Sequence, residues 1–126
     1  TVQFQGDETP AYCEGFAQRA IKAIRVKDRA SLDIMGSFRV RAFVLDAYRE
    51  GEYGGTGQTF DWDLAVAAKA HGRIILAGGL TPDNVAEAIA QVRPYGVDVN
   101  TGVKATDGGA KDASKVRSFV HNARQA

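Results

Sequence analysis

Five polar residues interrupt otherwise apolar runs of the sequence, and they are the first candidates for chemistry. They are Gln5, Lys22, Asp46, Asp98 and Asn100. Each alternates with apolar neighbours, so the polar side chains should share one face of a strand and the apolar side chains the other. Asp46 lies near the end of its run, and a carboxyl group at a strand end can act as a general acid or base. The alternative for Lys22 is a structural ion pair inside the core, for example with Asp98.

Three glycine-rich segments follow strand-like runs and could bind an anion. They contain Gly54, Gly55 and Gly57 in the first, Gly78 and Gly79 in the second, and Asn100, Thr101 and Gly102 in the third. Glycines at a turn from strand to helix let the backbone approach a ligand, and the N–H groups there can converge on a phosphate. The last two segments follow consecutive strands, which is where barrels of alternating strands and helices bind phosphate. Glycine also serves plain turns and helix ends, so each segment alone leaves that alternative open.

Apolar runs that alternate with helix-length segments should position these residues. Single helices between strands imply right-handed parallel βαβ units and therefore an α/β fold. Both an open doubly wound sheet and a segment of a (β/α)8 barrel satisfy this order. A polar strand face favours the barrel, whose interior is polar near its mouth. The expected strands are 1–5, 20–26, 41–47, 73–79 and 95–102, and the expected helices are 8–19, 28–36, 61–70, a segment from 81 that ends before Pro94, and 112–126.

Composition and charge exclude several classes of function. The chain has 126 residues and a formal net charge of +1, which suits one domain without affinity for nucleic acid or an anionic membrane. No apolar run approaches the roughly 20 residues that span a bilayer. Cys13 is the single cysteine and cannot form an internal disulfide, which fits the cytoplasm. His71 and His121 lack metal-ligand spacing, and neither a Walker A nor a GxGxxG pattern occurs, so we expect no metal or nucleotide.

The apolar positions also predict how the helices pack. Phe60 and Trp62 are expected to anchor the third helix, and Val116, Phe119 and Val120 should turn the last helix toward the core. Cysteine without a partner is commonly buried, so Cys13 is expected in the interior, and both histidines are expected at the surface. The absence of an initiator Met and the abrupt start in a strand predict a truncated chain.

Seven segments together resemble phosphoribosylanthranilate isomerase in order and spacing over nearly the whole chain. They are VQFQGDETP, IKAIRV, VLDAY, YGGTGQTFDWDL, LAGGLTPDNVAEAI, VRPYGVDVNTGV and KD, of which GGTGQTFDW and AGGLTPDNV are the most specific. The resemblance implies a (β/α)8 barrel seen from its fourth strand onward, so that residues 1–126 form the C-terminal part of one barrel domain. It also implies an Amadori rearrangement in tryptophan biosynthesis, without metal or organic cofactor. The small-molecule phosphosugar N-(5′-phosphoribosyl)anthranilate becomes 1-(2-carboxyphenylamino)-1-deoxyribulose 5-phosphate.

The same resemblance implies roles for individual residues. Asp46 matches the family's general acid, and Gln5, Asp98, Gly54, Gly55 and Gly57 match substrate-contacting positions. The phosphate-binding positions are Gly78, Gly79, Asn100, Thr101 and Gly102. Two residues depart from the family, because Gln5 stands for His in LHGDE and Lys104 for Glu in VDVSSGVE.

The resemblance also implies that two functional groups are missing. The family's base is a cysteine in a Cys-Gly segment of the first barrel strand, and Cys13 does not correspond to it. Neither Arg25 nor Arg39 corresponds to the family's arginine for the anthranilate carboxylate. The chain alone is therefore expected to be inactive.

Two other functions remain open at this point. A non-catalytic half-barrel could bind phosphate, associate with a separate N-terminal segment, or self-associate through open strand edges. The other possible function is that of a different phosphosugar barrel enzyme, such as an indole-glycerol-phosphate synthase. The segment GGTGQTFDW argues against this hypothesis.

Overall fold

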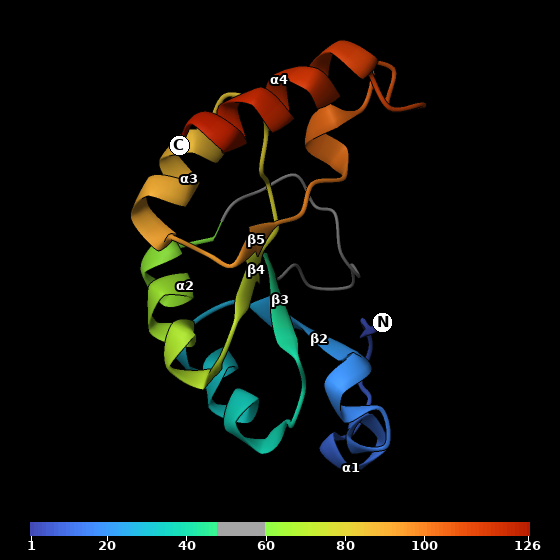
Figure 1. Cartoon of the computed structure of the whole chain (residues 1–126), viewed down its shortest axis with the longest axis vertical. Coiled ribbons are helices and arrows are strands. Elements are labelled where there is room, and N and C mark those ends of the chain that lie inside the picture. Colours follow the sequence, from blue (N-terminus) through green and yellow to red (C-terminus); the bar gives the residue numbers. More distant parts are fainter. Residues whose placement is uncertain (48–59) are drawn as a thin grey trace.

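A single parallel sheet runs through the molecule (Figure 1). The computed structural model describes residues 1–47 and 60–126. Each strand pairs with the one before it in sequence, so the sheet winds in one direction without the reversal that a doubly wound sheet requires. The predicted α/β fold, a five-strand segment of a (β/α)8 barrel, is therefore confirmed. The strands are β1 (Val2–Phe4), β2 (Ala20–Val26), β3 (Ala42–Ala47), β4 (Ile74–Leu76) and β5 (Gly96–Val97).

Helices follow the strands and form an arc along one face of the sheet (Figure 1). Polar side chains cap four of them, because the first N–H groups of a helix lack partners within it. The caps are Thr9, Asp28, Asp61 and Asp112. The α-helices are α1 (Pro10–Glu14), α2 (Trp62–Ala68), α3 (Val85–Val92) and α4 (Ala113–Gln125), and the 3-10 helices are η1 (Ala17–Arg19), η2 (Arg29–Ser37), η3 (Lys69–His71) and η4 (Thr101–Val103).

Several elements are shorter than predicted. The helix expected over 8–19 is divided into α1 and η1, and the one over 28–36 is the 3-10 helix η2. β4 ends before Gly78 and Gly79, whose φ angles of 80° and 68° are incompatible with an extended strand. β5 has two residues because, within the described ranges, it pairs with β4 alone.

The main core lies between the sheet and the helices. Ile24, Leu45 and Leu76 from the strands pack there with Val85 of α3 and Phe119 of α4. Val85, Ala88 and Val92 form the buried stripe of α3. The predicted packing role of Phe60 and Trp62, which contact this core, is confirmed. A second cluster joins Phe4, Cys13 and Ala20, and Cys13 is fully buried as predicted.

The prediction that Val116 and Val120 face the core is wrong. Their exposed fractions are 38% and 41%, whereas Phe119 is 4% exposed. Phe119 and Ala123 pack against the core, and Asn122 Nδ2 donates to the carbonyl of Pro82 at 2.8 Å. These contacts rotate α4 so that the valines, which lie to one side of this face, remain uncovered.

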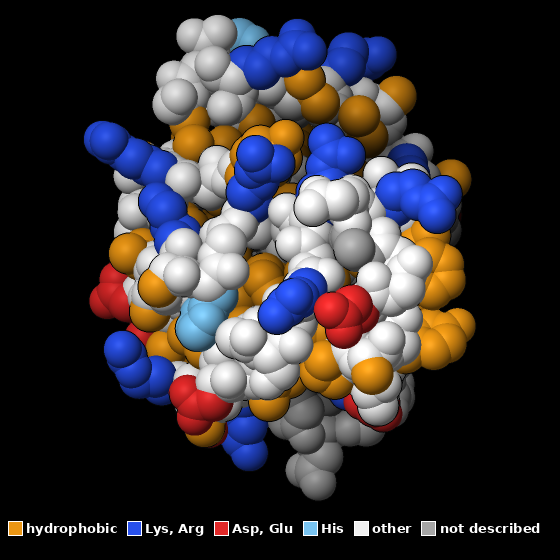
Figure 2. All heavy atoms as spheres, turned by 60° about the horizontal axis from the view of Figure 1, so that its bottom comes forward, with side chains coloured by type: hydrophobic (Ala, Val, Ile, Leu, Met, Phe, Trp, Pro, Cys, Tyr) orange, Lys and Arg blue, Asp and Glu red, His pale blue; other side chains and the backbone are white. Residues whose placement is uncertain are grey.

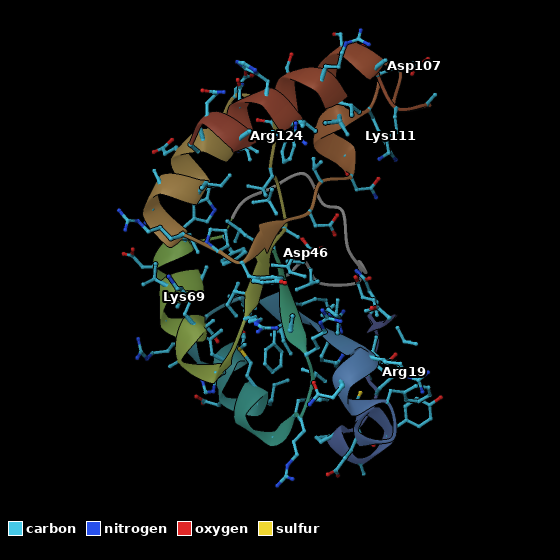
Figure 3. All side chains as sticks on the ribbon, viewed as in Figure 1. Arg19, Asp46, Lys69, Asp107, Lys111 and Arg124 are labelled. Atoms are coloured by element: carbon cyan, nitrogen blue, oxygen red, sulfur yellow. The ribbon has the colours of Figure 1, made fainter. Side chains whose placement is uncertain are left out.

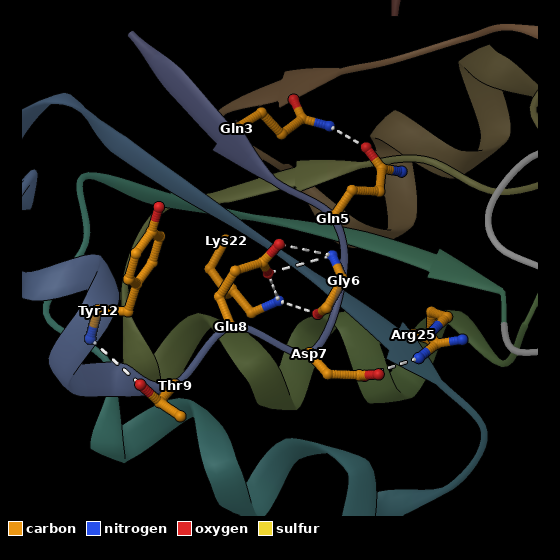
Figure 4. Close-up of polar contacts among 9 residues, drawn as sticks. All are labelled: Gln3, Gln5, Gly6, Asp7, Glu8, Thr9, Tyr12, Lys22 and Arg25. Atoms are coloured by element: carbon orange, nitrogen blue, oxygen red, sulfur yellow. Dashed lines mark hydrogen bonds and ion pairs between the residues drawn. The ribbon is translucent and has the colours of Figure 1, made fainter.

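The prediction that Lys22 shares the polar face of the sheet with Asp46 is wrong. The Lys22 side chain is buried on the helix-covered face, in register between Phe4 and Phe43. The amine donates to the carbonyl oxygen of Gly6 at 2.7 Å and pairs with Glu8 Oε2 at 3.2 Å (Figure 4). The alternative of a structural ion pair is therefore confirmed, with Glu8 and not Asp98 as the partner. Lys22 thereby fixes the turn that directly follows Gln5.

Replacing Glu8 with Gln should lower the free energy of unfolding by about 1 kcal/mol at pH 7, because the buried Lys22 amine loses its charged partner. Burial raises the pKa of Glu8, but hydrogen bonds from backbone N–H groups and from Lys22 outweigh it, so the net pKa is lowered. The stabilisation of the fold by ionised Glu8 is therefore fully present above pH 4.5, the ordinary pKa of a glutamate. It is lost as the pH falls through the lowered pKa of Glu8.

Urea unfolding at pH 7 and at acidic pH measures this effect. Glu14→Gln is the matched control, since Glu14 makes only a 3.9 Å ion pair between two exposed side chains. Equal losses for both variants at pH 7, or a Glu8→Gln loss that does not shrink in acid, would contradict the role of the pair.

Candidate functional site

An open cavity of about 510 Å³ lies where β3, β4 and β5 end. It brings together eight of the eleven residues to which the resemblance assigns a role, although they lie far apart along the chain. Gly54, Gly55 and Gly57 lie outside the described residues. The eight are Gln5, Asp46, Gly78, Gly79, Asp98, Asn100, Thr101 and Gly102.

Asp46 supplies the cavity's buried carboxyl group. Its exposed fraction is 6%, and its position near the end of β3 places it at the strand ends, as Figure 3 shows. Phe43 and Leu45 occupy the opposite face of β3 and pack in the main core, so Asp46 faces away from the helices. Its Oδ1 accepts the N–H of Ala47 at 2.8 Å, which orients the carboxyl group. Its register partner on β2 is Arg25.

The loop after β4 lies directly against this carboxyl group. A Cβ atom on Gly78 would lie 2.7 Å from Asp46 Oδ1 and 2.5 Å from the backbone nitrogen of Ala47. The φ angle of Gly78 is also positive, so both space and conformation require glycine there. The loop thus brings a phosphate-binding candidate into contact with the acid candidate.

The loops after β4 and β5 are pressed together. A Cβ atom on Gly102 would lie 1.9 Å from the carbonyl oxygen of Leu80. Asn84 holds the first loop in shape, because its Oδ1 accepts the N–H of Thr81 at 2.8 Å and its Nδ2 donates to the Gly79 carbonyl at 3.0 Å. Asn84 directly precedes α3, and its role in this loop was not predicted from the sequence. Together the two loops form one wall of the cavity, which we call the cradle.

Lys104 gives the cavity a positive charge that sequence reasoning did not place there. It is half-buried and, among the described lining residues, it is the cationic one. The carboxyl groups of Asp46 and Asp98 line the same cavity. The sequence placed Lys104 just beyond the phosphate loop. The 3-10 helix η4 turns the chain back so that Lys104 returns to the cavity wall.

Other titratable candidates lie away from this cavity. Cys13 is buried in α1, and burial raises the pKa of its thiol. His71 and His121 are exposed, as predicted. Arg25 pairs with Asp7 at 3.3 Å (Figure 4).

Two features are absent from residues 1–47 and 60–126, the parts of the chain that the structure describes. Within them, no group of three His, Cys, Asp or Glu side chains could hold a metal ion. Their helices are also too short or too polar to cross a membrane.

Comparison with known proteins matches this geometry to one family. A family model described as N-(5′-phosphoribosyl)anthranilate (PRA) isomerase matches residues 1–122. The N-(5′-phosphoribosyl)anthranilate isomerase of Geobacter sulfurreducens is 56% identical over 123 residues, which are 98% of this chain and 60% of that protein. The corresponding protein of Pelobacter propionicus is 54% identical over 124 residues, or 98% of this chain and 59% of its own length.

Solved structures agree with the sequence comparison. Phosphoribosyl anthranilate isomerase from Thermotoga maritima superposes with a TM-score of 0.84 at 38% identity, over 98% of this chain and 61% of that one. Another isomerase structure, in complex with reduced 1-(o-carboxyphenylamino)-1-deoxyribulose 5-phosphate, gives a TM-score of 0.79 at 32% identity, over 98% of this chain and 59% of that one. The chain spans about three fifths of the length of these relatives. It belongs to the N-(5′-phosphoribosyl)anthranilate isomerase family.

Proposed function

We propose that this chain carries the general acid and the phosphate cradle of a phosphoribosylanthranilate isomerase, as the C-terminal part of its barrel domain. The supporting observation is that one cavity contains the buried carboxyl group of Asp46 and both glycine loops. The reaction is the cofactor-independent conversion of N-(5′-phosphoribosyl)anthranilate to 1-(2-carboxyphenylamino)-1-deoxyribulose 5-phosphate in tryptophan biosynthesis. The single buried thiol suits the cytoplasm, where we place this reaction.

In this proposal Asp46 opens the ribose ring. Its carboxyl group gives a proton to the ring oxygen while the bond from that oxygen to C1′ breaks, and the anthranilate nitrogen forms a C=N bond to C1′. A base then removes the proton from C2′, and the resulting enol tautomerises to the ketone. The contacts of Asp46 with Ala47 and the Gly78 loop hold the acid at one place for the first step.

The cradle would hold the 5′-phosphate and so fix the sugar relative to Asp46. Backbone N–H groups of the two loops and the side chains of Asn100 and Thr101 can donate to phosphate oxygens. Lys104 would balance part of the phosphate charge, since it lines the same cavity. Its replacement of the family's glutamate therefore favours phosphate binding in this proposal.

Gln5 and Asp98 line the same cavity and are proposed to contact the sugar. Gly54, Gly55 and Gly57 are proposed to help close the site beside the acid.

The base that removes the C2′ proton is assigned to a part of the barrel that this chain does not span. Cys13 cannot supply it, because it is fully buried in α1 and does not line the cavity. We therefore expect no measurable turnover from the 126-residue chain alone. We expect turnover from a chimaera in which the first three βα units of the Geobacter sulfurreducens relative precede this chain.

A second candidate function is a phosphate-binding half-barrel that self-associates. It is favoured by the edge strands, since β1 and β5 each pair on one side within the described residues, and by the exposed valines of α4. Light scattering distinguishes the candidates. The half-barrel candidate predicts a dimer or larger species that binds phosphate, together with an inactive chimaera.

Binding of the reduced product analogue to the 126-residue chain tests the proposed site. We expect the NMR resonances of Gly78, Gly79, Gly102 and Asp46 to move on titration. Inorganic phosphate should move the three glycines and leave Asp46 less affected. Shifts confined to residues outside the cavity, or none with either ligand, would overturn the proposed site.

A further inference from the structure

The amine of Lys111 is hydrogen-bonded to Asn100, which lies eleven residues earlier in the chain. Lys111 Nζ donates to the backbone carbonyl of Asn100 at 2.7 Å and to its side-chain Oδ1. Figure 3 shows Lys111 beside η4, at the end of the molecule where the chain leaves β5. Asn100 lines the candidate cavity and Lys111 does not, so Lys111 is one contact removed from the cavity.

A short hairpin brings Lys111 back to this position. Lys104 and Lys111 face each other in an antiparallel bridge, and the N–H of Ala105 donates to the carbonyl of Ala110 at 2.9 Å. The turn between them uses Gly108, whose φ angle is 75°. The N–H of Asp112 then donates to the Val103 carbonyl at 2.8 Å. The backbone on both sides of Lys111 is therefore held, which lowers the entropy cost of ordering its side chain.

The chemistry of the two side chains decides how Asn100 is oriented. A lysine ammonium has three donors and no acceptor, so the atom of Asn100 that meets it must be the oxygen. The remaining polar group of Asn100 is its NH2, which has two donors. Donors of this kind suit phosphate oxygens, whereas the carbonyl oxygen of an unrestrained Asn100 would repel them.

We propose that Lys111 is a positioning residue of the phosphate subsite, which holds Asn100 so that its NH2 group is available to a phosphate oxygen. The phosphate ligand in this inference rests on the proposed function, whereas the Lys111–Asn100 contact does not depend on it. Lys111 would act through Asn100, and its charge alone would not account for its effect.

Phosphate titrations of the 126-residue chain, followed by NMR, test this inference. Lys111→Met should weaken inorganic phosphate binding about tenfold, whereas Lys111→Arg, which keeps the donors, should recover most of the affinity. Arg117→Gln is the matched control, since it removes the same charge from an exposed position on α4 outside the cavity. It should change the affinity less than about twofold.

A double-mutant cycle separates positioning from charge. In an Asn100→Ala background, Lys111→Met should have almost no further effect, because the group that Lys111 positions is gone. A full tenfold effect in that background, or equal effects of Lys111→Met and Arg117→Gln, would overturn the inference. In the chimaera, Lys111→Met should raise KM and leave kcat within about twofold, whereas Arg117→Gln should change neither constant by more than about twofold.

The ligand-free spectrum keeps the contact testable even if phosphate does not bind. Lys111→Met should move the side-chain NH2 resonances of Asn100, and Arg117→Gln should not. An unmoved Asn100 signal in a folded Lys111→Met variant would overturn the contact. Failure of the unsubstituted chain to bind phosphate, with the Asn100 shift intact, would instead count against the proposed function.

Discussion

Replacing Asp46 with Asn is expected to lower the kcat of the chimaera about 100- to 10,000-fold, with little change in KM. Asparagine has nearly the same shape, and its Oδ1 can still accept the N–H of Ala47, so the loop after β4 should stay in place. The amide cannot give a proton to the ring oxygen, so the loss falls on the chemical step. Steady-state turnover of N-(5′-phosphoribosyl)anthranilate measures both constants.

Asp98→Asn is the matched control for this change. Asp98 lines the same cavity and loses the same charge, but it is an exposed residue beyond the end of β5 and is not the proposed acid. We expect it to raise KM more than it lowers kcat. A kcat for Asp46→Asn that matches the unsubstituted chimaera, or a larger kcat loss in Asp98→Asn, would remove Asp46 from the role of acid.

Replacing Gly102 with Ala is expected to weaken binding of inorganic phosphate to the 126-residue chain about a hundredfold. The added Cβ would lie 1.9 Å from the Leu80 carbonyl oxygen and 3.1 Å from the Cα of Thr81, both of them backbone atoms. The two loops must therefore separate by more than an ångström, a displacement that can cost about two orders of magnitude in a positioned site. The overlap should also cost about 1–3 kcal/mol of stability.

Gly36→Ala is the control for the loss of a glycine. A Cβ on Gly36 would meet its nearest neighbour, His71 Nδ1, at 3.8 Å, which is an ordinary contact. We expect this variant to bind phosphate normally. Unchanged phosphate affinity in a folded Gly102→Ala variant would show that the two loops do not act as one cradle.

The order of the elements and most of the cavity could be predicted from the sequence, because they depend on local signals. Asp28, Asp61 and Asp112 each precede a helix that they cap, and the glycines mark the turns after β4 and β5. In a parallel sheet the strand ends meet at one edge, so residues at those ends converge whatever the exact packing. Asp46 and the two loops follow this rule.

Lys22 could not be placed by the same reasoning, because its contacts are non-local. A polar residue in an apolar strand was assigned to the polar face, yet the side chains on both sides of it in the sheet, Phe4 and Phe43, lie on the helix-covered face. Its aliphatic stem is buried there while the amine reaches Gly6 and Glu8, which are sixteen and fourteen residues away. No periodicity in β2 contains that information.

The positions of Lys104 and Lys111 could not be predicted from the sequence for a related reason. Lys104 reaches the cavity after η4, and Lys111 reaches Asn100 after a hairpin; both paths depend on backbone hydrogen bonds between residues without a repeating pattern. The exposed Val116 and Val120 show the same limit, since the rotation of α4 is set by contacts of Phe119 and Asn122 with distant elements.

Turnover of N-(5′-phosphoribosyl)anthranilate by the chimaera tests most directly whether this chain supplies the acid and the phosphate cradle of an isomerase. We predict a kcat within about tenfold of that of the Geobacter sulfurreducens relative, because its N-terminal units would provide the base and this chain the rest. A folded chimaera that binds the reduced product analogue but does not turn over the substrate would contradict this assignment.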